Sequence, residues 1–82
     1  MDTKHLLGWL MEEKKMSKRA AKDVLSRCSR VYRILGISRL DNKSLVNLQE
    51  SQEFRDSSMF VKSQLKRTVT LCLEFMSISE KE

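Results

Sequence analysis

The stretch from Ser17 to Ile37 reads SKRAAKDVLSRCSRVYRILGI, and it decides the fold class of this chain. Its apolar residues recur at spacings of three and four, which is the repeat of an α-helix with one buried side. Ser17 precedes the repeat as the expected N-cap. Gly36 follows it as the expected left-handed C-cap, with Ile37 folding back over the last turn. The helix is expected over about residues 17–35, and its buried positions are Ala21, Val24, Leu25, Cys28, Val31, Tyr32 and Leu35.

A first helix is expected before this one, over about residues 3–15. Asp2 or Thr3 is its expected N-cap. Gly8 lies inside it and weakens it relative to alanine. Either another helix comes close at this glycine, or the glycine is simply tolerated.

A short third helix is expected over about residues 44–53. Asp41 or Ser44 is its expected cap, because both side chains can accept a backbone N–H. Phe54 is expected to enter the core just beyond it, before a turn at residues 55–58.

A fourth helix is expected over about residues 58–76, and residues 77–82 are expected to form a frayed tail. The apolar arc of this helix is much broader than that of the second, which indicates contact with several other helices. The chain has 82 residues with no proline and only two glycines, so turn-rich β folds are disfavoured. We therefore expect one all-α domain over residues 1–82, built as a compact four-helix bundle.

The composition and the cysteines indicate the cellular compartment of such a domain. Apolar residues make up 40% and charged residues 33%, a globular balance, and no apolar run approaches the ~20 residues that span a bilayer. The first residues lack the order of a signal peptide. Cys28 and Cys72 lie far apart without metal-ligand spacing. We expect a cytoplasmic protein with two buried, reduced thiols, and a structural disulfide is the alternative.

Charge is concentrated in one part of the chain. The net charge is +5, and the segment from Lys14 to Arg33 holds eight basic residues and one acid, Asp23. From Asp41 to Glu82 the charges nearly balance. This asymmetry favours an anionic partner, of which nucleic acid is the commonest.

Helical projection places much of this charge on one side of the second helix. At ~100° per residue, the side opposite Cys28 presents basic and hydroxyl side chains over about four turns. Lysine and arginine neutralise phosphates, and serine can donate to the same oxygens. The alternative is an ordinary solvated face, but the shortage of acids speaks against it. This basic face comprises Lys18, Arg19, Lys22, Ser26, Ser29, Arg30 and Arg33, with Ser17 at its start. Arg27 projects to the side, where we expect packing or a local ion pair.

The last helix carries a second polar strip, which is weaker because an acid interrupts it. A helix like the second can lie in or along a DNA major groove, and this strip could flank the same groove, or it could be a solvated face. Its members are Lys62, Ser63, Lys66, Arg67, Thr70 and Glu74.

Catalytic and cofactor chemistry has no support in this sequence. There is no glycine-rich phosphate loop, no carboxylate pair with a partner base and no cluster of metal ligands. His5 is the only histidine. We expect no enzymatic activity, no catalytic residue, no metal, no cofactor and no small-molecule substrate.

Two stretches resemble the N-terminal core-binding domain of tyrosine recombinases, the SAM-like four-helix domain of phage integrases. The residues from Trp9 to Ala21 read WLMEEKKMSKRAA, and those from Ser63 to Val69 read SQLKRTV before Leu73-Glu74-Phe75. The resemblance covers nearly the whole chain. It implies a clamp-like domain on duplex DNA, with contacts from Ser17, Lys18, Arg19, Lys22, Lys62, Lys66 and Arg67.

The sequence departs from that family in several places. The family usually has a hydroxyl residue near Ala20 or Ala21 and a tyrosine near Val24 or Leu25, and this sequence has neither. The arginines, histidines and tyrosine nucleophile of the recombinase catalytic domain have no counterpart here, so we expect no DNA cutting.

These observations predict a non-catalytic DNA-binding domain with little base specificity, recruited to phage or mobile-element DNA and hence connected with DNA recombination. The alternative is a protein–protein interaction module or homodimer, because apolar residues are abundant for a small bundle. Membrane attachment is disfavoured, since the apolar stripe of the second helix is needed for the core. The patch expected for the protein partner consists of Met11, Met16, Met59 and Phe60.

Overall fold

The computed structural model describes residues 3–81 and is helical with no strand in that range. The expected all-α class is confirmed, and the expected N-cap Asp2 lies outside the described residues. There are five helices where four were expected. They are α1 (Thr3–Glu12), α2 (Lys18–Leu35), α3 (Ser44–Glu50), α4 (Gln52–Arg55) and α5 (Met59–Lys81).

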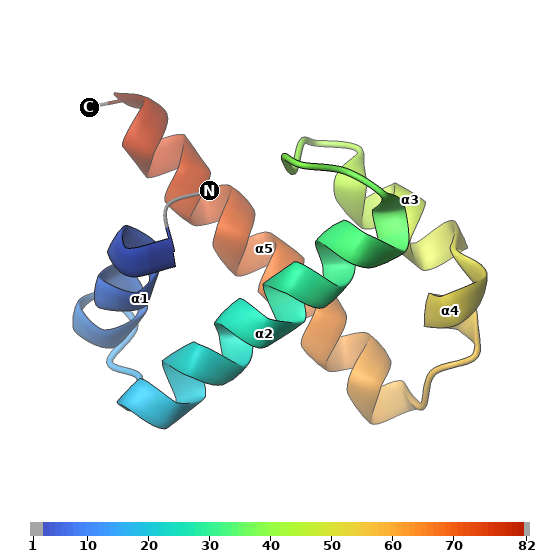
Figure 1. The fold of residues 1–82 in the computed structure, drawn as a ribbon, viewed down its shortest axis with the longest axis horizontal. Helices are drawn as coiled ribbons and strands as arrows, with labels where there is room; N and C mark the ends of the chain where they lie inside the picture. The colour runs from blue at the N-terminus through green and yellow to red at the C-terminus, as the bar shows by residue number, and fades with distance from the viewer. Residues whose placement is uncertain (1–2, 82) are drawn as a thin grey trace.

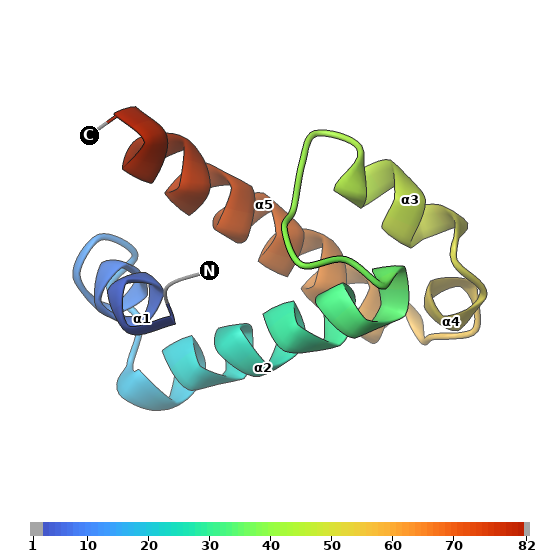
Figure 2. The same cartoon turned by 45° about the horizontal axis from the view of Figure 1, so that its top comes forward.

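The two long helices, α2 and α5, cross near the centre of the molecule (Figure 1). Helix α1 lies at one end of this crossing, and α3 and α4 lie at the other, as both Figure 1 and Figure 2 show. One hydrophobic core joins all five helices. Its buried apolar residues are Leu6, Leu10, Ala21, Val24, Cys28, Val31, Leu40, Leu48, Phe54, Leu65, Val69, Leu71, Cys72 and Phe75.

Helix α2 begins and ends as its sequence predicts. The Ser17 side chain accepts the Ala20 N–H at 3.2 Å and so satisfies one of the free donors of the first turn. Gly36 adopts a left-handed φ of 63°. Its N–H donates to Arg33 O, and the Ile37 N–H donates to Tyr32 O at 3.1 Å, which is the paired closure of a Schellman motif.

Helix α1 is shorter than expected, because it ends at Glu12 instead of Lys15. The chain has to turn within four residues to reach the Ser17 cap. It does so with Lys15 in the left-handed region, at φ 56°, and with the Met16 N–H closing onto Leu10 O at 3.2 Å.

The expected third helix is divided in two by Ser51. Its hydroxyl donates to Leu48 O at 2.7 Å and accepts the Phe54 N–H at 3.3 Å, so the same residue ends α3 and caps α4. Serine favours such local bonds over a helix interior. The break turns Phe54 into the core, where it is 7% exposed, as expected.

Neither Asp41 nor Ser44 caps α3, so this expectation was wrong. The N-cap position is Lys43, whose side chain makes no cap bond. Asp41 instead closes the preceding turn by accepting the Lys43 N–H at 2.8 Å, and Ser44 Oγ accepts the Asp41 N–H at 2.8 Å.

The last helix runs further than expected. Ser58 caps it by accepting the Val61 N–H at 3.2 Å, and it continues past Met76 to Lys81 in place of the expected frayed tail. No glycine or proline follows Met76, so nothing in the sequence stops the helix there.

The two glycines differ in backbone conformation but not in the space around them. A Cβ added at either one would meet no atom within 4 Å, so no helix approaches Gly8 closely. We expect Gly8→Ala to raise the free energy of unfolding by about 1 kcal/mol, because alanine is the better helix former. Gly36→Ala is the matched control and should lower it by about 1 kcal/mol, because its φ is positive. Urea unfolding of both variants tests this, and destabilisation by Gly8→Ala would contradict it.

Tyr32 places its hydroxyl in the core without a hydrogen-bond partner among the described residues. Burial, together with the nearby Cys28 and Cys72, raises the pKa of this phenol to about 12. The folded state therefore holds the proton more tightly than the unfolded state, whose pKa is about 10. The contribution of this pKa shift to the free energy of unfolding is therefore fully present below pH 10. It is lost as the pH rises to about 12.

Replacing Tyr32 by phenylalanine removes both the buried hydroxyl and its titration at alkaline pH. We expect Tyr32→Phe to raise the free energy of unfolding at neutral pH by about 1 kcal/mol, because it removes a buried hydroxyl without a partner. The variant should also lose less stability than the wild type between pH 10 and 12. Denaturant unfolding at pH 7, 10 and 12 measures the free energy of unfolding of the variant and the wild type. If both proteins lost the same amount of stability between pH 10 and 12, the alkaline loss would not come from Tyr32.

Candidate nucleic-acid interface

The basic face lies on the outside of α2 because the opposite side is buried. Ala21, Val24, Cys28 and Val31 form the buried stripe against the rest of the bundle. The projection from the sequence is therefore confirmed for most of its members. The exposed ones are Lys18, Arg19, Lys22, Ser26, Ser29 and Arg33.

Ser17 stands at the beginning of this face with part of its hydrogen-bonding capacity in use. Its oxygen accepts the Ala20 N–H, so the cap is its structural role. The hydroxyl hydrogen is still able to donate, because accepting one bond does not use it.

Arg30 is the member of the basic face that is engaged elsewhere. Its Nε lies 3.7 Å from Glu53 Oε2 on α4, and the two side chains are 41% and 53% exposed. Such a surface pair contributes little stability, but it competes with a phosphate for the same guanidinium. The sequence could not show this, because Glu53 is brought to α2 only by the folding of α4 against the bundle.

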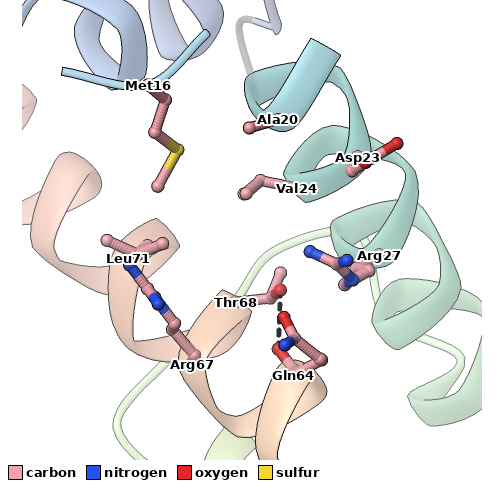
Figure 3. Close-up of a pocket in the computed structure, with 9 residues that line it drawn as sticks. All are labelled: Met16, Ala20, Asp23, Val24, Arg27, Gln64, Arg67, Thr68 and Leu71. Atoms are coloured by element: carbon pink, nitrogen blue, oxygen red, sulfur yellow. Dashed lines mark hydrogen bonds between the residues drawn. The ribbon is translucent and has the colours of Figure 1, made fainter. Parts of the chain in front are cut away.

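Arg27, which we expected to serve packing or a local ion pair, is half-buried and lines a groove between α2 and α5. The groove has a volume of about 260 Å³, and Figure 3 shows Arg27 reaching from α2 toward Gln64 and Thr68, while Asp23 points away. Arg67 lines it from α5. Neither arginine side chain has an ion-pair partner within the part of the chain that the structure describes. The remaining lining residues are Met16, Ala20, Val24 and Leu71.

The members of the polar strip expected on the last helix have different surroundings. Lys62 is half-buried, and its Nζ lies 5.9 Å from the centre of the Phe54 ring of α4. Lys66 is one turn further on the same side, whereas Arg67 is rotated by about 100° and lines the groove. Arg67 is therefore the member of the strip that shares a surface with α2 residues.

The acid that interrupts this strip has a structural role. Glu74 Oε1 lies 2.9 Å from Lys14 Nζ, and Lys14 also lies 5.2 Å from the centre of the Trp9 ring. Trp9 packs at 5.5 Å on Phe75. These contacts hold the end of α1 against α5.

Comparison with known proteins identifies no relative from which a role for the basic face could be inferred. No protein-family model matches the chain, and no significant match is found among curated proteins or solved structures. Within the described residues, no three His, Cys, Asp or Glu side chains are grouped so that they could hold a metal ion. The helices described in residues 3–81 also include none with the length and apolar character needed to cross a membrane.

Proposed function

We propose that this chain is a non-catalytic DNA-binding domain that lays the basic face of α2 along the phosphates of duplex DNA. One observation carries the proposal. Lys18, Arg19, Lys22 and Arg33 are exposed on one side of an 18-residue helix, and no carboxylate of the described residues pairs with them. Lys18 and Arg33 are separated by about 22 Å along the helix axis, a length comparable to several phosphate steps of one strand.

The groove beside α2 supports the same assignment. Arg27 of α2 and Arg67 of α5 both line it, and neither has an ion-pair partner among the described residues, although the acid Asp23 also belongs to the lining. The resemblance to the core-binding domain of tyrosine recombinases also favours DNA as the anion, and it is the reason to place the protein in the cytoplasm with phage or mobile-element DNA. Contacts from lysine and arginine to phosphates carry no sequence information, so we propose binding with little sequence preference.

Salt dependence gives the first test. If the four unpaired cations of the basic face each neutralise one phosphate, log K should fall with log salt at a slope of about −3.6. Fluorescence anisotropy with a labelled duplex over a salt series measures this slope. Absence of binding at low salt would refute the proposal.

Charge reversal at two positions tests where the DNA binds. Lys22→Glu with Arg33→Glu should reduce the salt slope by about 2 and weaken binding, because each residue contributes one phosphate contact. Arg30 is not used, since its reversal would also remove the pair with Glu53. Lys43→Glu with Arg55→Glu is the control, because it changes the net charge equally at exposed positions outside α2. Equal losses in both variants would show non-specific charge attraction and contradict the α2 interface.

A specific observation favours protein–protein interaction as the second candidate function. Met59 and Phe60 are 76% and 70% exposed at the beginning of α5, and large apolar side chains at such exposure are typical of interfaces. The four-residue patch expected from the sequence does not form, because Met16 lines the groove and Met11 belongs to α1 at the other end of the molecule (Figure 2). We propose the Met59–Phe60 pair alone as the contact.

Sedimentation velocity tests this second candidate. If the contact is a homodimer, the wild type should sediment as a dimer at high concentration, and Met59→Glu with Phe60→Glu should return it to a monomer. A wild type that remains monomeric at the highest concentration excludes self-association through this surface.

A further inference from the structure

The two cysteines of the chain face each other where the long helices cross. Cys28 lies on α2 and Cys72 on α5, and their Sγ atoms are 3.0 Å apart. Cys28 is 4% exposed and Cys72 is fully buried. This separation is shorter than the ~3.5–4 Å of an ordinary contact between non-bonded carbon atoms. Both thiols are unbonded and buried, as expected from the sequence.

The contact makes the two sulfurs chemically unequal. A hydrogen bond from Cys72 stabilises the Cys28 thiolate and lowers the pKa of Cys28. The same hydrogen bond, together with burial, raises the pKa of Cys72. Cys28 is also the more accessible of the two. Because the thiolate is the nucleophile in cysteine chemistry, Cys28 is the better suited of the two sulfurs to act as the nucleophile.

The residues around the two cysteines, and the absence of any other cysteine, limit the chemistry that is open to this pair. Two sulfurs with no third ligand among the described residues do not make a metal site. The chain contains no other cysteine, so an intramolecular disulfide can only join these two.

We propose that Cys28 and Cys72 form a site of reversible oxidative modification, in which a hydroperoxide converts the thiol pair into a disulfide. The Cys28 thiolate attacks the peroxide O–O bond, giving Cys28 sulfenic acid and releasing hydroxide, which takes up a proton to become water. The Cys72 sulfur then attacks the sulfenic sulfur, forming the S–S bond and releasing a second water. In sum, two thiols and one hydrogen peroxide give one disulfide and two waters.

Such a bond would tie α2 to α5 across a sequence separation of 44 residues, a segment that contains α3 and α4. A disulfide that closes a loop of this length restricts the unfolded chain strongly. The modification site is independent of the proposed DNA interface, because it lies on the buried side of α2.

The experiment treats the purified protein with equimolar hydrogen peroxide and maps it without reduction. Trypsin cuts after Arg27, Arg30, Arg67 and Lys81, so the expected product joins peptide 28–30 to peptide 68–81. The intact protein should lose the mass of two hydrogens and remain monomeric. Its thermal midpoint should rise by about 15 °C or more, and dithiothreitol should reverse every change.

Four results would overturn the proposal: thiols left unmodified by the peroxide, retained oxygen on either cysteine, a disulfide between two chains, or a crosslink without a rise in midpoint. Cys28→Ser and Cys72→Ser are the matched controls, and each should abolish the crosslink and the rise. If either variant fails to fold, the peptide map of the wild type decides the outcome by itself.

Discussion

The structure depends on the packing of one side of α2 against α5. Ala21, Val24, Cys28 and Val31 lie between the two helices and their neighbours, and burying this stripe is what holds the bundle together. The same burial fixes the rotation of α2 about its axis. Since apolar and basic residues occupy opposite sides of the helix, a core requirement on one side decides which cations meet solvent on the other.

The acidic residues explain why the basic face stays available. Two of them are used in tertiary contacts, Glu74 with Lys14 and Glu53 with Arg30. The first holds the end of α1 to α5, and the second links α2 to α4. Neither reaches Lys18, Lys22 or Arg33, so among the described residues Arg30 is the member of the basic face that a carboxylate pairs with. This division of charge is what makes an anionic partner the best-supported proposal.

The sequence predicted α2 well because its signals are local. The three/four repeat, the Ser17 cap and the Gly36 cap all act within one or two turns, and each is present in the structure. The expectations that were wrong or incomplete depend on contacts between residues that lie far apart in the sequence. Ser51 could continue a helix or break it, and the burial of Phe54 favours the break together with the local hydrogen bonds of the serine hydroxyl. The Arg30–Glu53 pair and the Arg27 groove depend on where α4 and α5 lie in space, so the candidate site was predicted in outline and not in its partners.

The crossing of α2 and α5 also has a kinetic consequence. The residues that meet there, such as Cys28 and Cys72, are 44 positions apart, so the core cannot form until a long loop has closed. Loop closure costs entropy before the contact compensates for it. The short α1–α2 connection, by contrast, allows those helices to associate early. A small helical protein with local contacts folds very fast, and this one should be slowed by the need to bring its last helix back to its second.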